Sequence, residues 1–313
     1  MILQIFIFII SLCLLCGGAD LLVRGSRQIA RAVGVSGLVV GLTVVSLGTS
    51  APELFISVVA ALNGNADLAI GNIVGSNIAN IGLVMALAAI VAGGIDFRHK
   101  RDFWVMVGLT FLTLPLMWDR RLGHWDGALL IIILCGYLFA VVWRAKARQT
   151  GRFELPSSEK PTQKSWAPLV FVVLGVTLLT FGSTLLRESV TVIATDLGVS
   201  ELVIALTMVS VGTSLPELAT SIMAVLKKEQ GLAIGNIVGS NIFNLAFVLG
   251  ITSVVSPIII SPEVLYKQYP AMLAITVLLL VLARLHKRIS RFDGYVLMAV
   301  YLCIIGFTLF MKF

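Results

Sequence analysis

The chain has 313 residues, of which 58% are hydrophobic and 12% are Asp, Glu, Lys or Arg, and its mean hydropathy is +1.01. This composition is typical of a protein whose solvent is lipid, and it excludes an ordinary soluble domain. The net charge of +7 does not indicate nucleic-acid binding, because Lys and Arg occur in short clusters between hydrophobic runs rather than on one continuous face.

Ten apolar stretches follow one another along the chain, each near the length of about 20 residues that crosses a bilayer as a helix. The sequence therefore predicts an all-α polytopic membrane protein with ten transmembrane helices in a lipid bilayer. The predicted spans are residues 2–22, 36–62, 67–92, 102–118, 125–143, 167–186, 199–226, 231–256, 266–284 and 293–311.

The loops between the spans carry unequal basic charge. If alternate loops lie on the same side of the membrane, 18 of the 23 Lys and Arg residues fall on one side. Short basic loops generally stay in the cytoplasm. We therefore expect both termini to be extracellular or periplasmic, in a multi-pass protein of the plasma (inner) membrane.

Two motifs occur twice, with a constant offset of 164 residues. LTVVSLGTSAPEL at Leu42–Leu54 recurs as LTMVSVGTSLPEL at Leu206–Leu218, and GNIVGSNI at Gly71–Ile78 recurs unchanged at Gly235–Ile242. Internal repeats of this kind are characteristic of transporters.

A polar linker, residues 145–166, separates the two copies and is expected in the cytoplasm. Five predicted spans precede it in residues 1–144, and five follow it in residues 167–313. Because five is an odd number, the second repeat enters the membrane from the opposite side. The repeats are therefore predicted to be inverted.

Each copy of the first motif places one glutamate, Glu53 or Glu217, inside an apolar span. An ionised side chain at the centre of a membrane helix costs about 3 kcal/mol on insertion scales, so such a residue generally faces a polar cavity. Helical spacing predicts that hydroxyl groups share the face of each acid, namely Ser46, Thr49 and Ser57 beside Glu53, and Ser210, Thr213 and Ser221 beside Glu217. This pattern predicts a shared cavity that holds a cation.

A proline, Pro52 or Pro216, directly precedes each glutamate. Proline lacks an N–H group, and its ring crowds the carbonyl four residues earlier, which belongs to Gly48 or Gly212. Broken backbone at membrane depth is tolerated where it lines a wet cavity, so we expect both helices to break there. A simple proline kink with a hydrogen-bonded glutamate would explain one copy, but it does not account for two.

The second motif combines glycines that permit close helix packing with a polar face. Helical spacing aligns residues 72, 76 and 80, and likewise residues 236, 240 and 244. The best ligand candidates on these faces are Ser76, Ser240, Asn80 and Asn244. Interhelical hydrogen bonding and ion ligation are equally compatible with Asn72, Asn77, Asn236 and Asn241.

The predicted site contains only oxygen ligands, which suits hard cations such as calcium or sodium. Magnesium, which holds its waters, fits less well. Transition metals would recruit thiolates or imidazoles, and no resident cofactor is expected. The cysteines fall inside apolar spans and are predicted to be buried structural thiols: Cys13, Cys16, Cys135 and Cys303.

The doubled GTSxPE and GNxxGSNI motifs resemble the alpha repeats of the sodium/calcium exchanger family, within the cation/calcium exchanger superfamily, and the resemblance covers essentially the whole chain. It implies a fold similar to the minimal prokaryotic exchangers, with the second, third, seventh and eighth helices around the ion sites. It also implies alternating access through movement of the first and sixth helices.

Carried over by motif position, the resemblance implies a calcium (metal) site made by Glu53, Glu217, Thr49 and Thr213. It implies that sodium is held by Ser46, Thr49, Ser50, Glu53, Ser76, Asn80, Ser210, Thr213, Ser214, Glu217, Ser240 and Asn244. The partners are then inorganic cations, and no catalytic residue is implied.

One position departs from the family pattern, because several members have an aspartate where this chain has Asn244. Two acids balance one calcium, two sodium ions or two protons, whereas three sodium ions would leave excess charge in a cavity of low dielectric constant. We therefore expect a near-electroneutral antiporter that exchanges calcium for sodium, with protons as the competing coupling ion.

Two alternatives come from other classes of protein. A passive cation channel could use the same acids, although it has no need of inverted broken helices. An intramembrane enzyme could use them as a catalytic pair, but the chain offers no further nucleophile or substrate-shaped polar domain. We therefore expect a transporter rather than an enzyme, functional as a monomer.

Overall fold

A computed structural model describes residues 2–96, 100–150, 166–198, 211–286 and 288–310, which are mostly helical. The N-terminal segment (residues 2–150) contains α1 (Ile2–Val33), α2 (Gly37–Val40), the π-helical turn η1 (Gly41–Val45), α3 (Ser46–Thr49), α4 (Ala51–Leu62), α5 (Ala66–Ala79), η2 (Asn80–Met85), α6 (Ala86–Ala92), β1 (Ile95–Asp96), α7 (Lys100–Leu116), β2 (Arg121–Leu122) and α8 (His124–Thr150).

The C-terminal segment (residues 166–310) follows a similar order. It contains α9 (Ala167–Asp196), α11 (Leu215–Leu226), α12 (Gln230–Phe243), η3 (Asn244–Val248), α13 (Leu249–Val255), β3 (Ile258–Ile259), η4 (Val264–Gln268), α14 (Tyr269–His286), β4 (Arg288–Ile289) and α15 (Arg291–Phe310).

Among the described residues, seven helical runs are long and apolar enough to cross a bilayer, and a bent pair of helices makes up to eight. The predicted polytopic helical fold is therefore confirmed. Two further predicted spans correspond to α7, with 17 residues, and to α11, with 12 residues. Residues 199–210 precede α11 and lie outside the described part, so the count of ten remains a prediction.

The predicted break in the second span is present. The run Gly37–Thr49 and the helix Ala51–Leu62 meet at an angle of 42°. Ser50 lies between them with φ −84° and ψ 4°, outside the helical region. Pro52 follows at the start of α4, where proline is tolerated because the first N–H groups of a helix have no partner within it.

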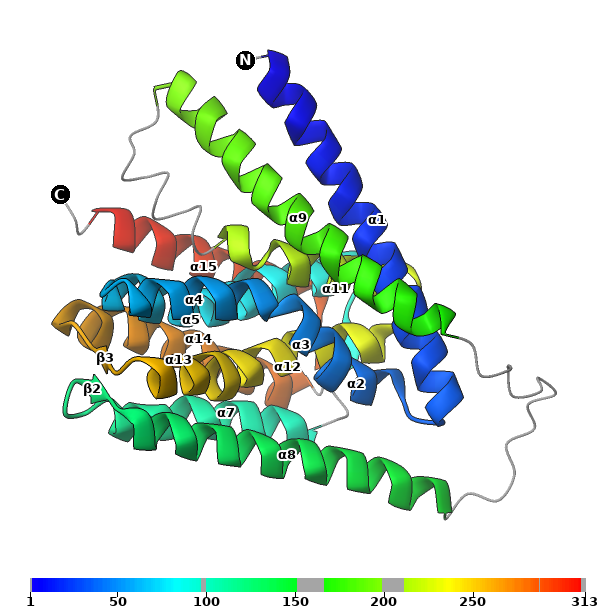
Figure 1. The fold of residues 1–313 in the computed structure, drawn as a ribbon. Coiled ribbons are helices and arrows are strands. Elements are labelled where there is room, and N and C mark those ends of the chain that lie inside the picture. Colours follow the sequence, from blue (N-terminus) through cyan, green and yellow to red (C-terminus); the bar gives the residue numbers. More distant parts are fainter. Residues whose placement is uncertain (1, 97–99, 151–165, 199–210, 287, 311–313) are drawn as a thin grey trace.

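Helices α1 and α9 lie side by side and cross the rest of the molecule obliquely (Figure 1). Glycines allow their backbones to approach closely. A Cβ atom added at Gly18 would lie 2.9 Å from the Gly175 carbonyl oxygen, and one at Gly25 would lie 2.7 Å from that of Pro168. Since rising residue numbers on α1 meet falling numbers on α9, the two helices are antiparallel. Small-residue interfaces of this type are common between membrane helices.

Two very short antiparallel sheets join the N-terminal and C-terminal segments. Strand β1 pairs with β4, and β2 pairs with β3. Helix α7 lies between β1 and β2 in the chain, and its 17 residues separate them by about 25 Å. The two sheets therefore lie at opposite ends of the helical bundle.

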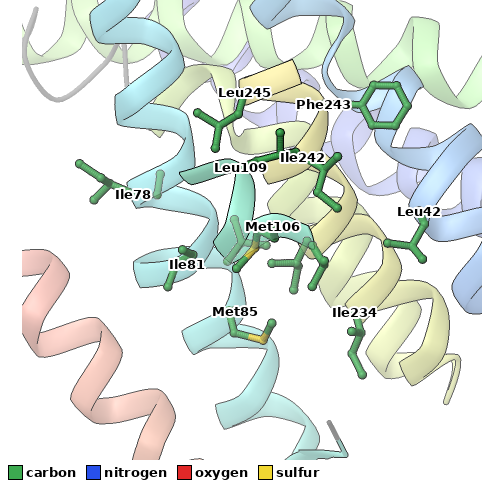
Figure 2. Close-up of a cluster of buried hydrophobic side chains, with 14 of the residues drawn as sticks. Leu42, Ile78, Ile81, Met85, Met106, Leu109, Ile234, Ile242, Phe243 and Leu245 are labelled. Carbon is green, nitrogen blue, oxygen red and sulfur yellow. The ribbon is translucent and has the colours of Figure 1, made fainter. Parts of the chain in front are cut away.

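The buried core lies where α5, η2, α7 and α12 meet. Figure 2 shows that this cluster is built from aliphatic, methionine and phenylalanine side chains of these elements and their neighbours. The labelled members are Leu42, Ile78, Ile81, Met85, Met106, Leu109, Ile234, Ile242, Phe243 and Leu245. Burial of these side chains holds the motif-bearing helices in fixed relative positions.

Ion pairs join α1 to the turn between α11 and α12. Asp20 pairs with Arg24 on its own helix at 2.7 Å and with Lys227. Arg27 Nε lies 2.9 Å from Glu229 Oε1. These residues are partly exposed, so the pairs stabilise the fold only modestly.

The prediction for the cysteines is wrong. All four are free and exposed on the outer surface of the helices: Cys13, Cys16, Cys135 and Cys303. An apolar sequence does not distinguish a position in the protein core from one that faces lipid, because both exclude water.

The α1–α9 contact generates a prediction about stability. Gly18→Ala should lower the melting temperature of the detergent-purified protein, because the new methyl group would force the two backbones apart at a cost of about 1–3 kcal/mol. Gly17→Ala is the matched control, since a Cβ there meets nothing within 4 Å. Equal melting temperatures for the two variants would contradict the proposed close contact.

Candidate ion-binding site

Both motif glutamates lie in the first turn of a helix that begins just after a break. Glu53 is the third residue of α4, and Glu217 is the third residue of α11. The residues that precede these helices, Ser50 and Ser214, have nearly the same backbone angles, with φ −84° at both and ψ 4° and 3°. The free N–H groups and positive dipole end of each helix therefore lie next to its acid.

The two carboxyl groups are completely buried, and their charges lie close enough to repel each other. Across the described part of the chain, none of their four oxygen atoms makes a hydrogen bond. Buried carboxylates are normally paired or hydrogen-bonded. Glu53 and Glu217 therefore have no partner among the described residues that offsets the cost of burying their carboxylates.

Hydroxyl groups of both segments surround the Glu217 carboxylate. The nearest belong to Thr49, Ser50 and Ser240, although none has full hydrogen-bond geometry to it. The Ser50 and Ser214 hydroxyls are buried and have no partner among the described residues. These hydroxyl oxygens, like the carboxylate oxygens, could therefore coordinate a bound cation.

Hydrogen bonds connect the two segments around the acids. Thr49 Oγ1 donates to Asn236 Oδ1 at 3.2 Å and lies 3.3 Å from Ser240 Oγ. On the other side, Ser76 Oγ lies 3.1 Å from Thr213 Oγ1. The structure thus places the first-motif threonine of each segment next to the second-motif serine of the other segment.

Ser46 has a different environment from the other predicted ligands. Its hydroxyl donates to the Gly41 carbonyl at 2.7 Å, and it lies 3.3 Å and 3.2 Å from the carbonyls of Gly235 and Asn236. A Cβ at Gly239 would lie 2.1 Å from this hydroxyl. Ser46 therefore packs α3 tightly against α12, and a sodium ion there would have to share it with these carbonyls.

Asn80 and Asn244 occupy equivalent positions at the start of the π-helical turns η2 and η3. Both side chains are fully buried, and neither amide group has a partner within the described residues. A π-turn widens a helix by one residue and occurs frequently at functional sites. The sequence does not reveal these turns, because the apolar periodicity continues through them.

The structure shows which hydrogen bonds the amide nitrogens of the other motif asparagines make. Asn72 donates to the Glu53 carbonyl and Asn236 to the Glu217 carbonyl, each on the neighbouring helix of the same segment. Asn77 and Asn241 each donate to a carbonyl of their own helix at 2.8 Å, that of Ile73 and Ile237. All four thus use their amide nitrogen for hydrogen bonds within the protein.

One predicted ligand and one residue that was not predicted remain. Ser210 lies outside the described residues. Thr220, which the motif comparison did not indicate, is buried with a hydroxyl that has no partner in the described ranges. Its counterpart 164 residues earlier is Ile56, so no duplicated signal exists that could have identified it.

The arrangement is chemically suited to a hard cation. It combines two carboxylates with neutral hydroxyl and amide oxygens, and the described residues contain no cluster of three or more His, Cys, Asp or Glu side chains. Calcium accepts six to eight oxygen ligands in irregular geometry, and two carboxylates neutralise its charge. A soft or transition metal would lack its preferred ligands here.

Comparisons with known proteins agree with this chemistry. The family model described as sodium/calcium exchanger protein matches residues 3–143 and 167–310. The putative antiporter CaxA of Alkalimonas amylolytica is 37% identical over 94% of this chain and 95% of its own length. The inner membrane protein YrbG of Escherichia coli is 34% identical over 89% of this chain and 88% of its own length.

The fold also matches a solved structure. The sodium-calcium exchanger NCX_Mj, soaked with sodium and calcium, superimposes with a TM-score of 0.83 at 30% sequence identity. The match covers 98% of each chain. It therefore includes the helices that carry both glutamates.

The unpartnered carboxylates generate a prediction about ligand-dependent stability. Calcium should raise the melting temperature of the purified protein, since binding at 100 times the dissociation constant contributes about 2.7 kcal/mol. The double variant Glu53→Gln, Glu217→Gln should lose this response. Glu188→Gln, which removes an exposed carboxylate on α9, should keep it. A calcium response of normal size in the double variant would place the bound ion elsewhere.

Proposed function

The chain belongs to the sodium/calcium exchanger family, and on that premise we propose that it is a secondary active antiporter that exchanges calcium for sodium across the membrane by alternating access. One observation carries this proposal. Glu53 and Glu217 come from duplicated motifs, are both fully buried and repel each other electrostatically, and no described residue balances their charge. A transported cation supplies the missing charge.

The proposed calcium ligands are the two acids and the two threonines that lie one helical turn before them, Thr49 and Thr213. Their support is burial together with hydrogen bonds that cross between the segments. The proposed sodium ligands are Ser46, Thr49, Ser50, Glu53, Ser76, Asn80, Ser210, Thr213, Ser214, Glu217, Ser240 and Asn244.

Charge balance governs the proposed stoichiometry. The proposed ligands, called the ion cage below, include only two acids, Glu53 and Glu217, because this chain has Asn244 where several family members have an aspartate. One calcium ion or two sodium ions neutralise the cage, whereas a third sodium ion would add an unbalanced charge in a water-poor site. Exchange is therefore near-electroneutral. Two protons satisfy the same balance, which makes calcium/proton exchange the second candidate.

Competition for one cage explains antiport. Calcium and sodium both need Glu53 and Glu217, so they cannot occupy the site together. An empty cage with two negative charges is costly to carry through a medium of low dielectric constant. The protein therefore changes its access side only when it is loaded with one ion type or the other, and this couples the two fluxes.

The proposed topology follows from charge and duplication. Ten helices form two inverted repeats, residues 1–144 and 167–313, joined by a cytoplasmic linker at residues 145–166, and both termini are outside. The basic clusters of the loops support this orientation. Residence in the plasma (inner) membrane is supported by the similarity to the inner membrane protein YrbG.

Transport by glutamine variants tests the ligand assignment. Glu53→Gln and Glu217→Gln should each reduce radioactive calcium uptake into proteoliposomes to the level of protein-free vesicles, because one carboxylate cannot balance a divalent ion. Glu188→Gln should transport at the wild-type rate. Normal exchange by Glu217→Gln would refute the assignment.

Separately imposed ion gradients test the coupling. An outward sodium gradient should drive calcium uptake, and a proton gradient alone should drive less. A membrane potential set with potassium and valinomycin should leave calcium accumulation unchanged, whereas net movement of one charge across 100 mV, worth about 2.3 kcal/mol, would shift it about 50-fold. Calcium flux that needs no counter-ion would indicate a channel instead.

A further inference from the structure

Two buried asparagines bind the helix turns that carry the acids. Asn72 Nδ2 donates to the Glu53 carbonyl at 3.2 Å and to Ser57 Oγ at 2.9 Å. Asn236 Nδ2 donates to the Glu217 carbonyl at 3.3 Å and to Ser221 Oγ at 2.9 Å. Two hydrogen bonds from one amide group thus attach each glutamate turn to the neighbouring helix.

The position of each acid depends on its backbone. Because no carboxylate oxygen has a partner in the described structure, a side-chain hydrogen bond does not hold either acid in place. Pro52 and Pro216 also weaken the helical hydrogen bonding just before each glutamate turn. The bond from each asparagine to the glutamate carbonyl therefore adds an attachment next to the break in the helix.

The two asparagines differ in what their carbonyl oxygen does. Asn236 Oδ1 accepts a hydrogen bond from Thr49 at 3.2 Å, and Thr49 belongs to the other segment. Asn72 Oδ1 is buried and has no partner among the described residues. The residue equivalent to Thr49 is Thr213, whose Oγ1 lies 3.1 Å from Ser76 Oγ. Among the described residues, Asn236 thus connects the threonine of one segment to the acid of the other, whereas Asn72 Oδ1 makes no such link.

We propose that Asn72 and Asn236 are positioning residues of the ion cage, and that Asn236 additionally couples Thr49 to the Glu217 turn. This inference rests on the proposed function, since it assumes that calcium is bound between the two acids. Calcium drawn to Thr49 and Glu217 meets ligands whose separation Asn236 has already set. Pre-organisation of this kind lowers the cost of binding.

Leucine variants test this role, because leucine approximates the shape of asparagine and makes no hydrogen bond. Asn236→Leu should weaken calcium binding by about 10-fold or more, the range typical of residues that orient metal ligands. Asn72→Leu should weaken it less, because only Asn236 also holds Thr49. Binding is measured by isothermal titration of calcium into the detergent-purified protein.

The matched control is Asn77→Leu. Asn77 is a buried asparagine of the same motif, but among the described residues its amide nitrogen bonds only the Ile73 carbonyl of its own helix. Its calcium affinity should stay close to that of the wild type. In proteoliposomes, Asn236→Leu should raise the KM for calcium while saturating calcium restores most of the maximal rate, whereas a general packing defect would lower the maximal rate with KM unchanged.

The outcomes separate the two proposals. Wild-type protein that binds no calcium contradicts the proposed function and the positioning role with it. Wild-type binding with unchanged affinity in Asn236→Leu contradicts the positioning role alone, as does an equal loss in Asn77→Leu. A melting temperature measured without calcium identifies any variant that fails to fold.

Discussion

The structure depends on two carboxylates that are buried in a membrane protein without compensating charge. Glu53 and Glu217 repel each other, and the described residues give neither a hydrogen bond. A protein that only needed to be stable would replace such groups by apolar ones. The cost is instead retained twice, at equivalent positions, and the surrounding hydroxyl and amide oxygens are the ligand type that a hard cation prefers.

The polar side chains around the two glutamates fall into two groups: those that make hydrogen bonds within the fold and those whose polar atoms have no partner among the described residues. Asn77 and Asn241 each donate their amide nitrogen to a carbonyl of their own helix, and Ser46 packs against the backbone of α12. Asn80 and Asn244, which open the π-turns, keep their polar atoms without partners. A rigid apolar cluster around α7 and α12 supports both groups (Figure 2). Closely packed helices thus surround a group of buried polar atoms that lack hydrogen-bond partners among the described residues.

The sequence predicted the parts of this arrangement that repeat. The broken helix follows from Pro52, and the burial of both glutamates follows from their apolar surroundings and their offset of 164 residues. The π-turns were not predictable, because the residues that follow Asn80 and Asn244 are apolar on every helix face, so the phase shift caused by one inserted residue leaves no mark in the sequence. Helix α1 extends to Val33, well beyond the predicted end at residue 22, because arginines at a membrane surface can extend from a continuing helix into water.

The partner of a polar group was harder to predict than its location. Helical spacing placed Asn72 and Asn236 on the polar face, but it could not show which atoms they meet on a neighbouring helix. The prediction that the cysteines are buried was wrong for a related reason, because positions facing lipid and positions in the protein core are filled by the same residue types. Contacts between helices depend on the packing angles and distances between the helices, and these cannot be predicted from the periodicity of one sequence.

The two small sheets restrict how the molecule can deform. Backbone hydrogen bonds of β1 with β4 fasten the N-terminal and C-terminal segments at one end of the bundle, and those of β2 with β3 fasten them at the other. Rocking of one segment as a block would tear a sheet apart. Helices α1 and α9 carry no strand, and glycine contacts join them closely to each other. A displacement of this helix pair relative to the bundle would leave both sheets intact and would break side-chain contacts, such as the partly exposed ion pairs to the turn between α11 and α12.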